Sequence, residues 1–379
     1  MTLVEIMFCL IRNEITGEAL PQNIEYDVEK LIGLSKSHDL AHLIADALIR
    51  NAVIDTTYSD YKNIKQEKLR AIYREVQRTY TYEKIMNAFS SDKIEFVPLK
   101  GILIRDLYPE PWMRSSCDID ILVHENDIER AKNSLINEGF TTDNRINYHD
   151  IHFYLDNVHL ELHHNICENN EQLDRLLSKV WDNIEPVSGV EYRENKEFFA
   201  FHHVAHMAYH FLAGGCGIRP FIDLWLMRQK QFYDDNGLIA LLNECELVPF
   251  YDAVCDLIDV WFGNKEHTEL TQAMSDYVIS GGVYGNKKNS ETIGIAQNNE
   301  SKAKYLFTLA FLQYENMCVL YPSLRKHKIL LPFCYIHRFF YKLFGKDKKR
   351  VRNRIQNIKQ RDADDVKGKA GLLKELNLK

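Results

Sequence analysis

A segment of about 100 residues, an ordinary size for one domain, interrupts an otherwise helical pattern and constrains the fold most strongly. Ile94–Leu99 and Ile119–Val123 are apolar runs typical of buried strands, and Asp127–Glu138 has the pattern of a helix that ends at Gly139. Residues 152–164 read as a hairpin of two strands. The order of these elements predicts an α+β fold, in which a small mixed-sheet domain is flanked by N-terminal and C-terminal helical regions.

The expected domain organisation has four parts. Residues 1–90 form an N-terminal helical region, 91–190 the strand-containing domain, 191–345 a C-terminal helical domain, and 346–379 a basic tail that is a candidate for a mobile segment. A chain of 379 residues is longer than one ordinary hydrophobic core requires, which favours such a division. Residues 280–301 are polar and rich in glycine and asparagine, so we expect a loop there.

Charge and cysteine content exclude several classes of function. The formal net charge of −7 argues against broad, nonspecific binding of nucleic acid. The eight cysteines are scattered without a CxxC pair, which excludes the usual zinc-ribbon spacing and fits reduced thiols in a cytoplasmic protein. We expect neither a signal peptide nor a transmembrane segment, since the most apolar stretch, Ile329–Phe344, is interrupted by Pro332, Arg338 and Lys342.

Asp118 and Asp120 are the residues that most clearly indicate chemistry. They stand at the head of the apolar run Ile121–Val123, and residues two apart on a strand point to the same face. Two carboxylates on one rigid edge suit Mg²⁺ (or Mn²⁺), which prefers oxygen ligands and keeps substrate phosphates in its shell. The bare acid-x-acid pattern also fits a solvated surface pair, as at Glu244–Glu246, so it is the surrounding sequence that favours a metal site.

Lys100-Gly101 is a candidate phosphate-binding turn. It follows a strand and opens a helix, where glycine allows a phosphate to approach the backbone and the helix N-terminus favours anions. Lys100 and Arg114 add positive charge. Taken alone, the same turn fits a plain strand-to-helix connection with a surface lysine.

Glu161 is the candidate third carboxylate. In Val158–His164, strand alternation places Glu161 on one polar face with His159 and His163. There it can serve as metal ligand or as general base toward an acceptor hydroxyl, with His163 as the reserve base. An edge strand with a polar face toward solvent is the alternative.

Together these motifs carry a family resemblance. The run FVPLKGILIRDLYPEPWMRSSCDIDILV, at residues 96–123, and the strand HLELHH, at 159–164, are similar to a bacterial family of uncharacterised nucleotidyltransferases of the polymerase-beta-like superfamily. The resemblance covers roughly residues 60–345. It implies metal-binding roles for Asp118 and Asp120, phosphate contact near Lys100 and Gly101, and a third acidic role for Glu161.

One feature departs from the pattern of the wider superfamily. That superfamily usually has Gly-Ser or Gly-Gly before the aspartate pair, and the serine contacts the terminal phosphates. Here Gly101 is followed by Ile102, and sixteen residues separate Gly101 from Asp118. We expect Arg114, Ser115 or Ser116 to take the place of that serine.

The region after residue 195 offers further polar candidates. His202, His206 and His210 share one helical face, which we interpret first as a packed or surface face, with a polar lining of the cleft or a zinc site as alternatives. Arg219 and Asp223 fit a structural ion pair, or groups that reach the cleft. The stretch Lys342–Arg361 has nine basic residues and one acidic residue, and a solvated helix is its default reading. Contact with RNA, anionic lipid or a phosphorylated acceptor is its alternative.

The favoured function is the transfer of a nucleoside monophosphate from an NTP to an acceptor, with release of pyrophosphate. The acceptor is a small molecule, saccharide, protein or tRNA. A toxin-like nucleotidyltransferase that acts on tRNA or protein is one alternative. A catalytically silent nucleotide-binding or scaffold protein is the other, and a misplaced Glu161 would favour it.

Overall fold

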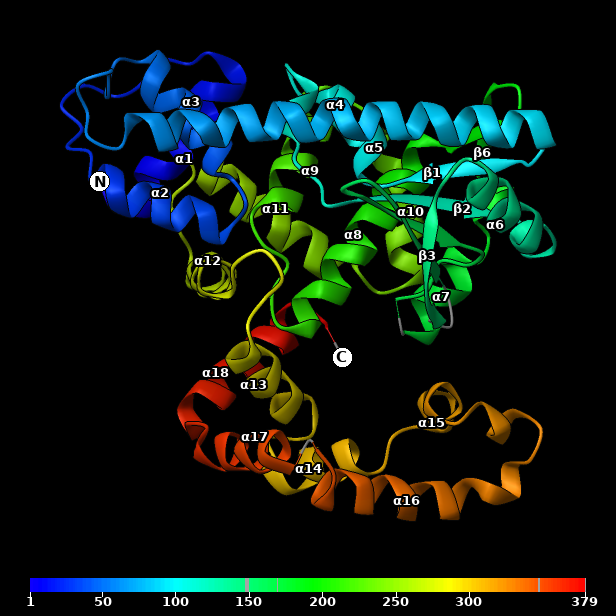
Figure 1. Ribbon diagram of the computed structural model, residues 1–379. Helices are drawn as coiled ribbons and strands as arrows, with labels where there is room; N and C mark the ends of the chain where they lie inside the picture. The colour runs from blue at the N-terminus through cyan, green and yellow to red at the C-terminus, as the bar shows by residue number, and fades with distance from the viewer. Residues whose placement is uncertain (147–149, 169, 347, 379) are drawn as a thin grey trace.

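The computed structural model describes residues 1–146, 150–168, 170–346 and 348–378. In this part of the chain, seven strands form one mixed sheet in the order β3-β4-β5-β2-β1-β7-β6 (Figure 1). β2 is central, with β5 parallel on one side and β1 antiparallel on the other. The predicted α+β fold, a mixed sheet flanked by helices, is confirmed.

The strands are β1 (Phe96–Leu99), β2 (Asp118–Val123), β3 (Thr141–Ile146), β4 (Asp150–Leu155), β5 (Val158–His163), β6 (Ile184–Ser188) and β7 (Glu191–Glu194). The helices that precede the sheet or lie between its strands are α1 (Leu3–Thr16), α2 (Val28–Ser37), α3 (Ala41–Arg50), α4 (Tyr61–Asp92), α5 (Gly101–Ile104), α6 (Ile128–Asn137) and α7 (Glu171–Leu177). The helices that follow are α8 (Lys196–Ala213), α9 (Arg219–Gln229), α10 (Asp235–Glu244), α11 (Val248–Phe262), α12 (Glu269–Gly281), α13 (Lys287–Gln297), α14 (Lys302–Ala310), α15 (Tyr314–Leu320), α16 (Leu331–Phe344), α17 (Lys348–Gln360) and α18 (Ala363–Glu375).

The two faces of the sheet pack against different helices, because side chains alternate along each strand. Ile119 and Ile121 of β2 are buried with side chains of α4 and α6. Leu122 points the other way and belongs to a larger core that includes the buried side chains of α8. Asp118 and Asp120 alternate with the isoleucines, so they share the face of Leu122 and lie on the α8 side of the sheet.

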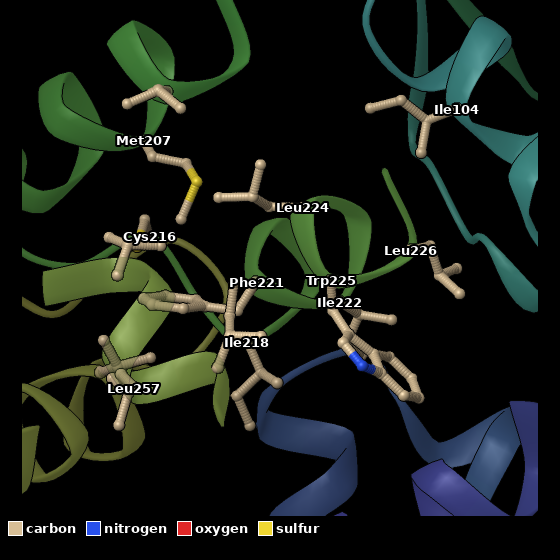
Figure 2. Packing of buried hydrophobic residues seen from close by; sticks show 14 of the residues in the cluster. Ile104, Met207, Cys216, Ile218, Phe221, Ile222, Leu224, Trp225, Leu226 and Leu257 are labelled. Atoms are coloured by element: carbon tan, nitrogen blue, oxygen red, sulfur yellow. The ribbon is translucent and has the colours of Figure 1, made fainter. Parts of the chain in front are cut away.

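One large hydrophobic core joins the N-terminal helices to the helices that follow the sheet. It contains buried side chains of α1 and α3 together with those of α8, α9 and α11. Figure 2 shows Phe221, Leu224 and Trp225 of α9 pointing to different sides, with Met207 of α8 and Leu257 of α11 nearby. A helix that is apolar on most sides has to be buried, so α9 also carries its acidic residue, Asp223, into the core.

The prediction of a loop at residues 280–301 is wrong for Lys287–Gln297, which forms α13. Asn286 caps this helix by accepting a hydrogen bond from the backbone N–H of Asn289 at 2.8 Å. Ile293 and Ile295 are buried. Tertiary packing of a few apolar side chains therefore overrides the polar composition of the segment.

Part of the buried face of the long helix α4 is ionic. Val76 and Tyr80 are exposed, whereas Glu75 and Arg78 are buried. Arg105 donates a hydrogen bond to Glu75 at 2.6 Å, and Arg78 pairs with the same carboxylate. Charged side chains that are paired with one another can therefore be buried in the middle of this helix.

Residues 346–379, the expected basic tail, contain helices α17 and α18, while Asp347 and Lys379 lie outside the described residues. Leu372 and Leu373 of α18 are buried, and this helix packs against α13 and α12. Among the residues that the structure describes, no helix combines the length and the apolar character needed to cross a membrane.

Candidate functional site

The aspartate pair lies at the start of β2, where both neighbouring strands fix its position. Leu99 of β1 and Glu161 of β5 are the register partners of Asp120. Asp120 is buried, whereas Asp118 is half-buried and its Oδ1 accepts a hydrogen bond from Ser116 Oγ at 3.0 Å. Both aspartates line one cleft. The shared strand and shared face that the spacing predicts are therefore found.

Asp120, Glu161 and His163 form a cluster with the chemistry of a divalent-metal site. His163 Nε2 is 3.0 Å from Asp120 Oδ1 and 3.7 Å from Glu161 Oε2. The potential ligand atoms of the three residues all lie within 4.8 Å of one another. Carboxylate oxygens suit Mg²⁺ and Mn²⁺, and an imidazole nitrogen is better tolerated by Mn²⁺. The residues present therefore fit such an ion.

Glu161 belongs to a second group of potential ligands as well. His152 and His159 offer nitrogen atoms that lie within 4.8 Å of each other and of a Glu161 oxygen. His152 Nδ1 and His159 Nε2 are 2.8 Å apart. Glu161 thus stands between the aspartate side of the cluster and a pair of imidazoles.

Lys100 adopts a backbone conformation that residues other than glycine rarely adopt, with φ 49° and ψ −117°. Such conformations cost about 1–3 kcal/mol and gather at functional sites. Lys100 Nζ is 3.6 Å from Asp120 Oδ1. Burial alone would lower the pKa of Lys100, but the charges of Asp120 and Glu168 raise it above its usual value. The strained turn therefore holds a permanent cation beside the aspartate pair.

Gly101 is required by the close approach of Arg114. A Cβ at this position would lie 2.6 Å from Arg114 Nη1. The guanidinium cannot easily move, because its Nη2 and Nε donate to the two oxygens of Asp223 at 2.8 and 3.2 Å. Tyr108 donates a further hydrogen bond to Asp223 at 2.7 Å. Arg114, expected at the phosphates, lines the cleft and at the same time forms this buried pair.

The surroundings of Asp120 and Glu161 shift the pKa values of these two neighbouring carboxyl groups in opposite directions. Burial would raise the pKa of Asp120, but Lys100 and His163 outweigh it and hold that pKa well below its usual value. Burial and the repulsion of Asp120 and Asp118 raise the pKa of Glu161 to about 7. Glu161 is therefore poised to exchange a proton near neutral pH, as a general base must.

The histidines of α8 line the cleft on the side opposite the sheet. His206 Nδ1 is 2.7 Å from Glu168 Oε1 and its Nε2 is 2.9 Å from His210 Nε2. His202 Nδ1 is 2.9 Å from Glu194 Oε1. Burial lowers the pKa values of His206 and His210, which keeps both imidazoles neutral. Of the three interpretations of this face, a polar lining of the cleft agrees best with these contacts.

The Arg219–Asp223 ion pair is not formed, because Asp223 points into the core and pairs with Arg114. Arg219 Nη1 instead donates to the carbonyl oxygen of Ser115 at 2.5 Å and lies 3.3 Å from Asp39 Oδ2. Ser115 Oγ also donates to Asp39 Oδ2, at 2.8 Å. Of the two serines expected at the phosphates, Ser116 lines the cleft and Ser115 faces this neighbouring network.

The cleft has a volume of about 300 Å³ and lies between the sheet and the helices that follow it. Its sheet side carries Lys100, the aspartate pair and Glu161, and its helical side carries the α8 histidines and Arg219. Tyr284, in the connection after α12, lines the cleft as well, and its hydroxyl is 3.3 Å from Cys117 Sγ. A cleft with a few convergent polar groups, between a sheet and the helices packed on it, is a common location for a small-molecule site.

Sequence reasoning missed several residues of this site. It named His163 only as a reserve base, although strand alternation places it two residues from Glu161 on the same face and therefore near Asp120. Tyr284 has no local signal, because only the fold brings it to the cleft. The same holds for Glu168 and Glu194, which contact His206 and His202 of the cleft lining.

A family model described as uncharacterised nucleotidyltransferase matches residues 25–263, more than half of the chain. No curated protein and no solved structure matches the chain. The matched residues contain the aspartate pair, Lys100-Gly101, Glu161 and the α8 histidines. The chain therefore belongs to this family of uncharacterised nucleotidyltransferases.

Proposed function

We propose that this protein transfers a nucleoside monophosphate from an NTP to an acceptor, releases pyrophosphate, and depends on Mg²⁺ or Mn²⁺. The observation that carries the proposal is the register of β2 and β5. It sets the buried Asp120 opposite Glu161, next to Asp118 and within reach of Lys100 Nζ. Three carboxylates and a cation at the floor of one cleft match what the α-phosphate of a metal-bound NTP requires.

Asp120, Glu161 and His163 have potential ligand atoms within 4.8 Å of one another, and we propose that they hold the metal ion. Asp118 would join them as a further carboxylate ligand from the same face of β2, and His163 would suit Mn²⁺ in particular. When bound, the cation neutralises phosphate charge and polarises the α-phosphorus for in-line attack. Lys100 supplies a fixed positive charge beside it, and Gly101 would let the guanidinium of Arg114 lie against the backbone of the phosphate-binding turn. Arg114 and Ser116 would contact phosphates from the cleft wall. Ser115 would position Arg219 by accepting its hydrogen bond.

Glu161 would accept the proton of the attacking hydroxyl. The pKa of Glu161, about 7, is that of the site without a bound metal ion. The charge of the ion would lower this pKa, so Glu161 would be ionised and able to accept a proton at neutral pH. The helices after residue 195 would cover the nucleotide and select the acceptor, since α8 and Arg219 form the cleft wall opposite the aspartates. The reaction would take place in the cytoplasm, where NTPs are available.

The position of Glu161 supports an enzyme more than a silent nucleotide binder. A nucleotide binder needs the metal site but no general base. Glu161 is the register partner of Asp120, and its pKa is raised to about 7, which are the properties expected of a base. The acceptor remains a small molecule, saccharide, protein or tRNA.

The experiment is a screen of the four NTPs for pyrophosphate release, with full-length protein, Mg²⁺ or Mn²⁺, and cell extract as the source of acceptor. We expect release with at least one NTP, its loss on chelation of the metal, and its loss in Asp120→Asn. The matched control is Glu244→Gln/Glu246→Gln, which alters an exposed acid-x-acid pair far from the cleft motif. Release that is equal in Asp120→Asn and in the control would contradict the proposal.

A further inference from the structure

The helix α16 exposes an apolar stripe that the described residues leave uncovered. Phe333, Ile336, Phe340 and Phe344 are 68%, 55%, 56% and 73% exposed. Their spacing of three and four residues places them on one side of the helix. In Figure 1, α16 lies along the edge of the molecule opposite α4, away from the sheet. A contiguous apolar surface of this kind marks a site of interaction.

The opposite side of α16 is fixed to the rest of the chain. Tyr335 donates a hydrogen bond to the carbonyl oxygen of Leu312, and Arg338 Nη2 donates to that of Leu309 at 3.0 Å. Cys334 and Tyr335 pack against a small core around Met317. Because these contacts orient the helix, its aromatic stripe faces outward as part of the fold.

The segment of the chain that contains the stripe is strongly basic. Residues 316–361 contain thirteen lysines and arginines and one acidic residue, although the whole chain carries a net charge of −7. Lys348, Lys349 and Arg352 of α17 line an open groove together with Leu343 of α16. Basic and apolar side chains therefore share one surface.

We propose that α16 and α17 dock this protein on the surface of an anionic phospholipid bilayer. Phenylalanine and isoleucine side chains on one face, with lysines and arginines beside them, are the composition of helices that lie in the interface of a membrane. The apolar stripe enters the boundary of the acyl chains while α17 contacts the lipid phosphates. Each lysine or arginine near such a surface strengthens binding severalfold.

Charge complementarity favours an anionic bilayer over two alternative partners, a second copy of the chain and single-stranded RNA. A second copy of the chain would bring two strongly basic surfaces together, which like-charge repulsion opposes. Single-stranded RNA would match the basic residues and could stack on phenylalanines, but it offers nothing apolar to Ile336 and Leu343. An anionic bilayer satisfies both the charge and the aliphatic side chains.

The test is co-sedimentation of the full-length protein with vesicles of phosphatidylcholine alone or mixed with phosphatidylglycerol, at low and high salt. We expect binding to the mixed vesicles and its weakening by salt, because a screened surface potential attracts basic residues less. Lys348→Gln/Lys349→Gln/Arg352→Gln should lower the partition coefficient on the order of a hundredfold. Phe333→Ser/Phe340→Ser/Phe344→Ser should abolish binding.

Matched controls are available on α4, which also exposes apolar and basic side chains. Tyr73→Ser/Val76→Ser/Tyr80→Ser and Lys62→Gln/Lys65→Gln/Arg70→Gln change exposed residues of the same kinds and should leave vesicle binding unchanged. Nucleotidyl transfer is not measured, so the outcome is independent of the proposed reaction.

Three results would overturn the proposal. The first is absence of binding to anionic vesicles, and the second is equal binding to neutral ones. The third is a loss of vesicle binding in the α4 variants as large as in the α16 variants. If vesicles are not bound, affinity for single-stranded RNA that the α17 variant lacks would assign the surface to RNA. A concentration-dependent dimer that the α16 variant lacks would assign it to a second copy.

Discussion

Asp120 of β2 and Glu161 of β5 are direct register partners in a parallel pair of strands, yet their surroundings move their pKa values in opposite directions. Lys100 and His163 keep the pKa of Asp120 low against the effect of burial, whereas burial and the neighbouring aspartates raise that of Glu161 to about 7. In many active sites, two neighbouring titratable groups have pKa values that their surroundings drive apart, and the two groups then have different roles. One stabilises charge and the other transfers a proton. Asp120 is thereby suited to hold a cation and Glu161 to move a proton.

Glu161→Gln should lower the turnover number about 10²–10⁴-fold, the usual effect of losing a general base. The amide keeps the volume of the side chain, so NTP binding should weaken far less than turnover falls. Steady-state kinetics of pyrophosphate release measure both. Near-normal turnover in Glu161→Gln, together with an inactive His163→Asn, would instead assign the proton transfer to the histidine.

Asp223→Asn should destabilise the protein by about 3–5 kcal/mol, because it leaves the buried charge of Arg114 without its partner. The control is Asp259→Asn, which removes the carboxylate from another arginine, Arg228. Both pairs have an N···O distance of 2.8 Å, but the Arg228 pair is half-exposed whereas the Arg114 pair is buried. The control should cost no more than about 1 kcal/mol. Urea unfolding measures the free energy of unfolding of both variants. If both lose the same amount, burial does not determine how much the Arg114 pair contributes to stability.

Gly101→Ala should destabilise the fold by about 1–3 kcal/mol, the cost of an overpacked site, and lower activity as well. The new methyl group would collide with the guanidinium of Arg114, which Asp223 holds in place. Gly33→Ala is the matched control, since a Cβ there meets nothing within 4 Å and the residue lies inside α2. That change should stabilise the protein by about 0.5–1 kcal/mol. Thermal melts and pyrophosphate release test both variants. If Gly101→Ala is as stable and as active as the wild type, the predicted clash with Arg114 does not occur.

Glu14 should make the protein less stable as the pH rises. Burial and the neighbouring carboxyl group of Asp46 raise its pKa from 4.5 to about 8. Below pH 4.5 both the folded and the unfolded state carry the proton, so Glu14 does not make stability depend on pH there. Between these values only the unfolded state loses it, and the free energy of unfolding falls by up to about 1.4 kcal/mol per pH unit. Above the folded pKa the loss levels off.

Glu14→Gln should remove this slope and stabilise the protein at neutral pH. Glu25→Gln, at an exposed position, is the control and should leave the slope unchanged. Urea unfolding at several pH values measures both. A stability of Glu14→Gln that falls with pH as steeply as that of the wild type would contradict the assignment.

Local patterns were sufficient where one periodicity dominates. The apolar run after Asp120 and the alternation around Glu161 predict β2 and β5, and with them the shared face of the candidate ligands. α13 was missed because its buried residues are few and its composition is polar. β6 and β7 were missed because their side chains are mostly exposed or half-buried, so no apolar alternation indicates them.

Contacts between distant segments could not be predicted from the sequence in the same way. An ion pair between Asp223 and Arg219 was one of two interpretations of these neighbouring residues. The burial of α9 instead turns Asp223 toward Arg114, which lies 109 residues away in the sequence. Glu168 and Glu194 reach the α8 histidines through the packing of α8 against the sheet domain. Such pairs depend on tertiary position, which periodicity does not encode.

Binding of Mn²⁺ measured by electron paramagnetic resonance, with full-length protein and a non-hydrolysable NTP analogue, tests most directly whether Asp118 and Asp120 hold the ion of the NTP complex. The wild type should bind Mn²⁺ together with the analogue, and Asp118→Asn and Asp120→Asn should each weaken that binding at least about tenfold while their melting curves still show a folded protein. Glu244→Gln/Glu246→Gln should bind as the wild type does. Wild-type Mn²⁺ affinity in both aspartate variants would contradict the assignment of the metal site and, with it, the proposed reaction.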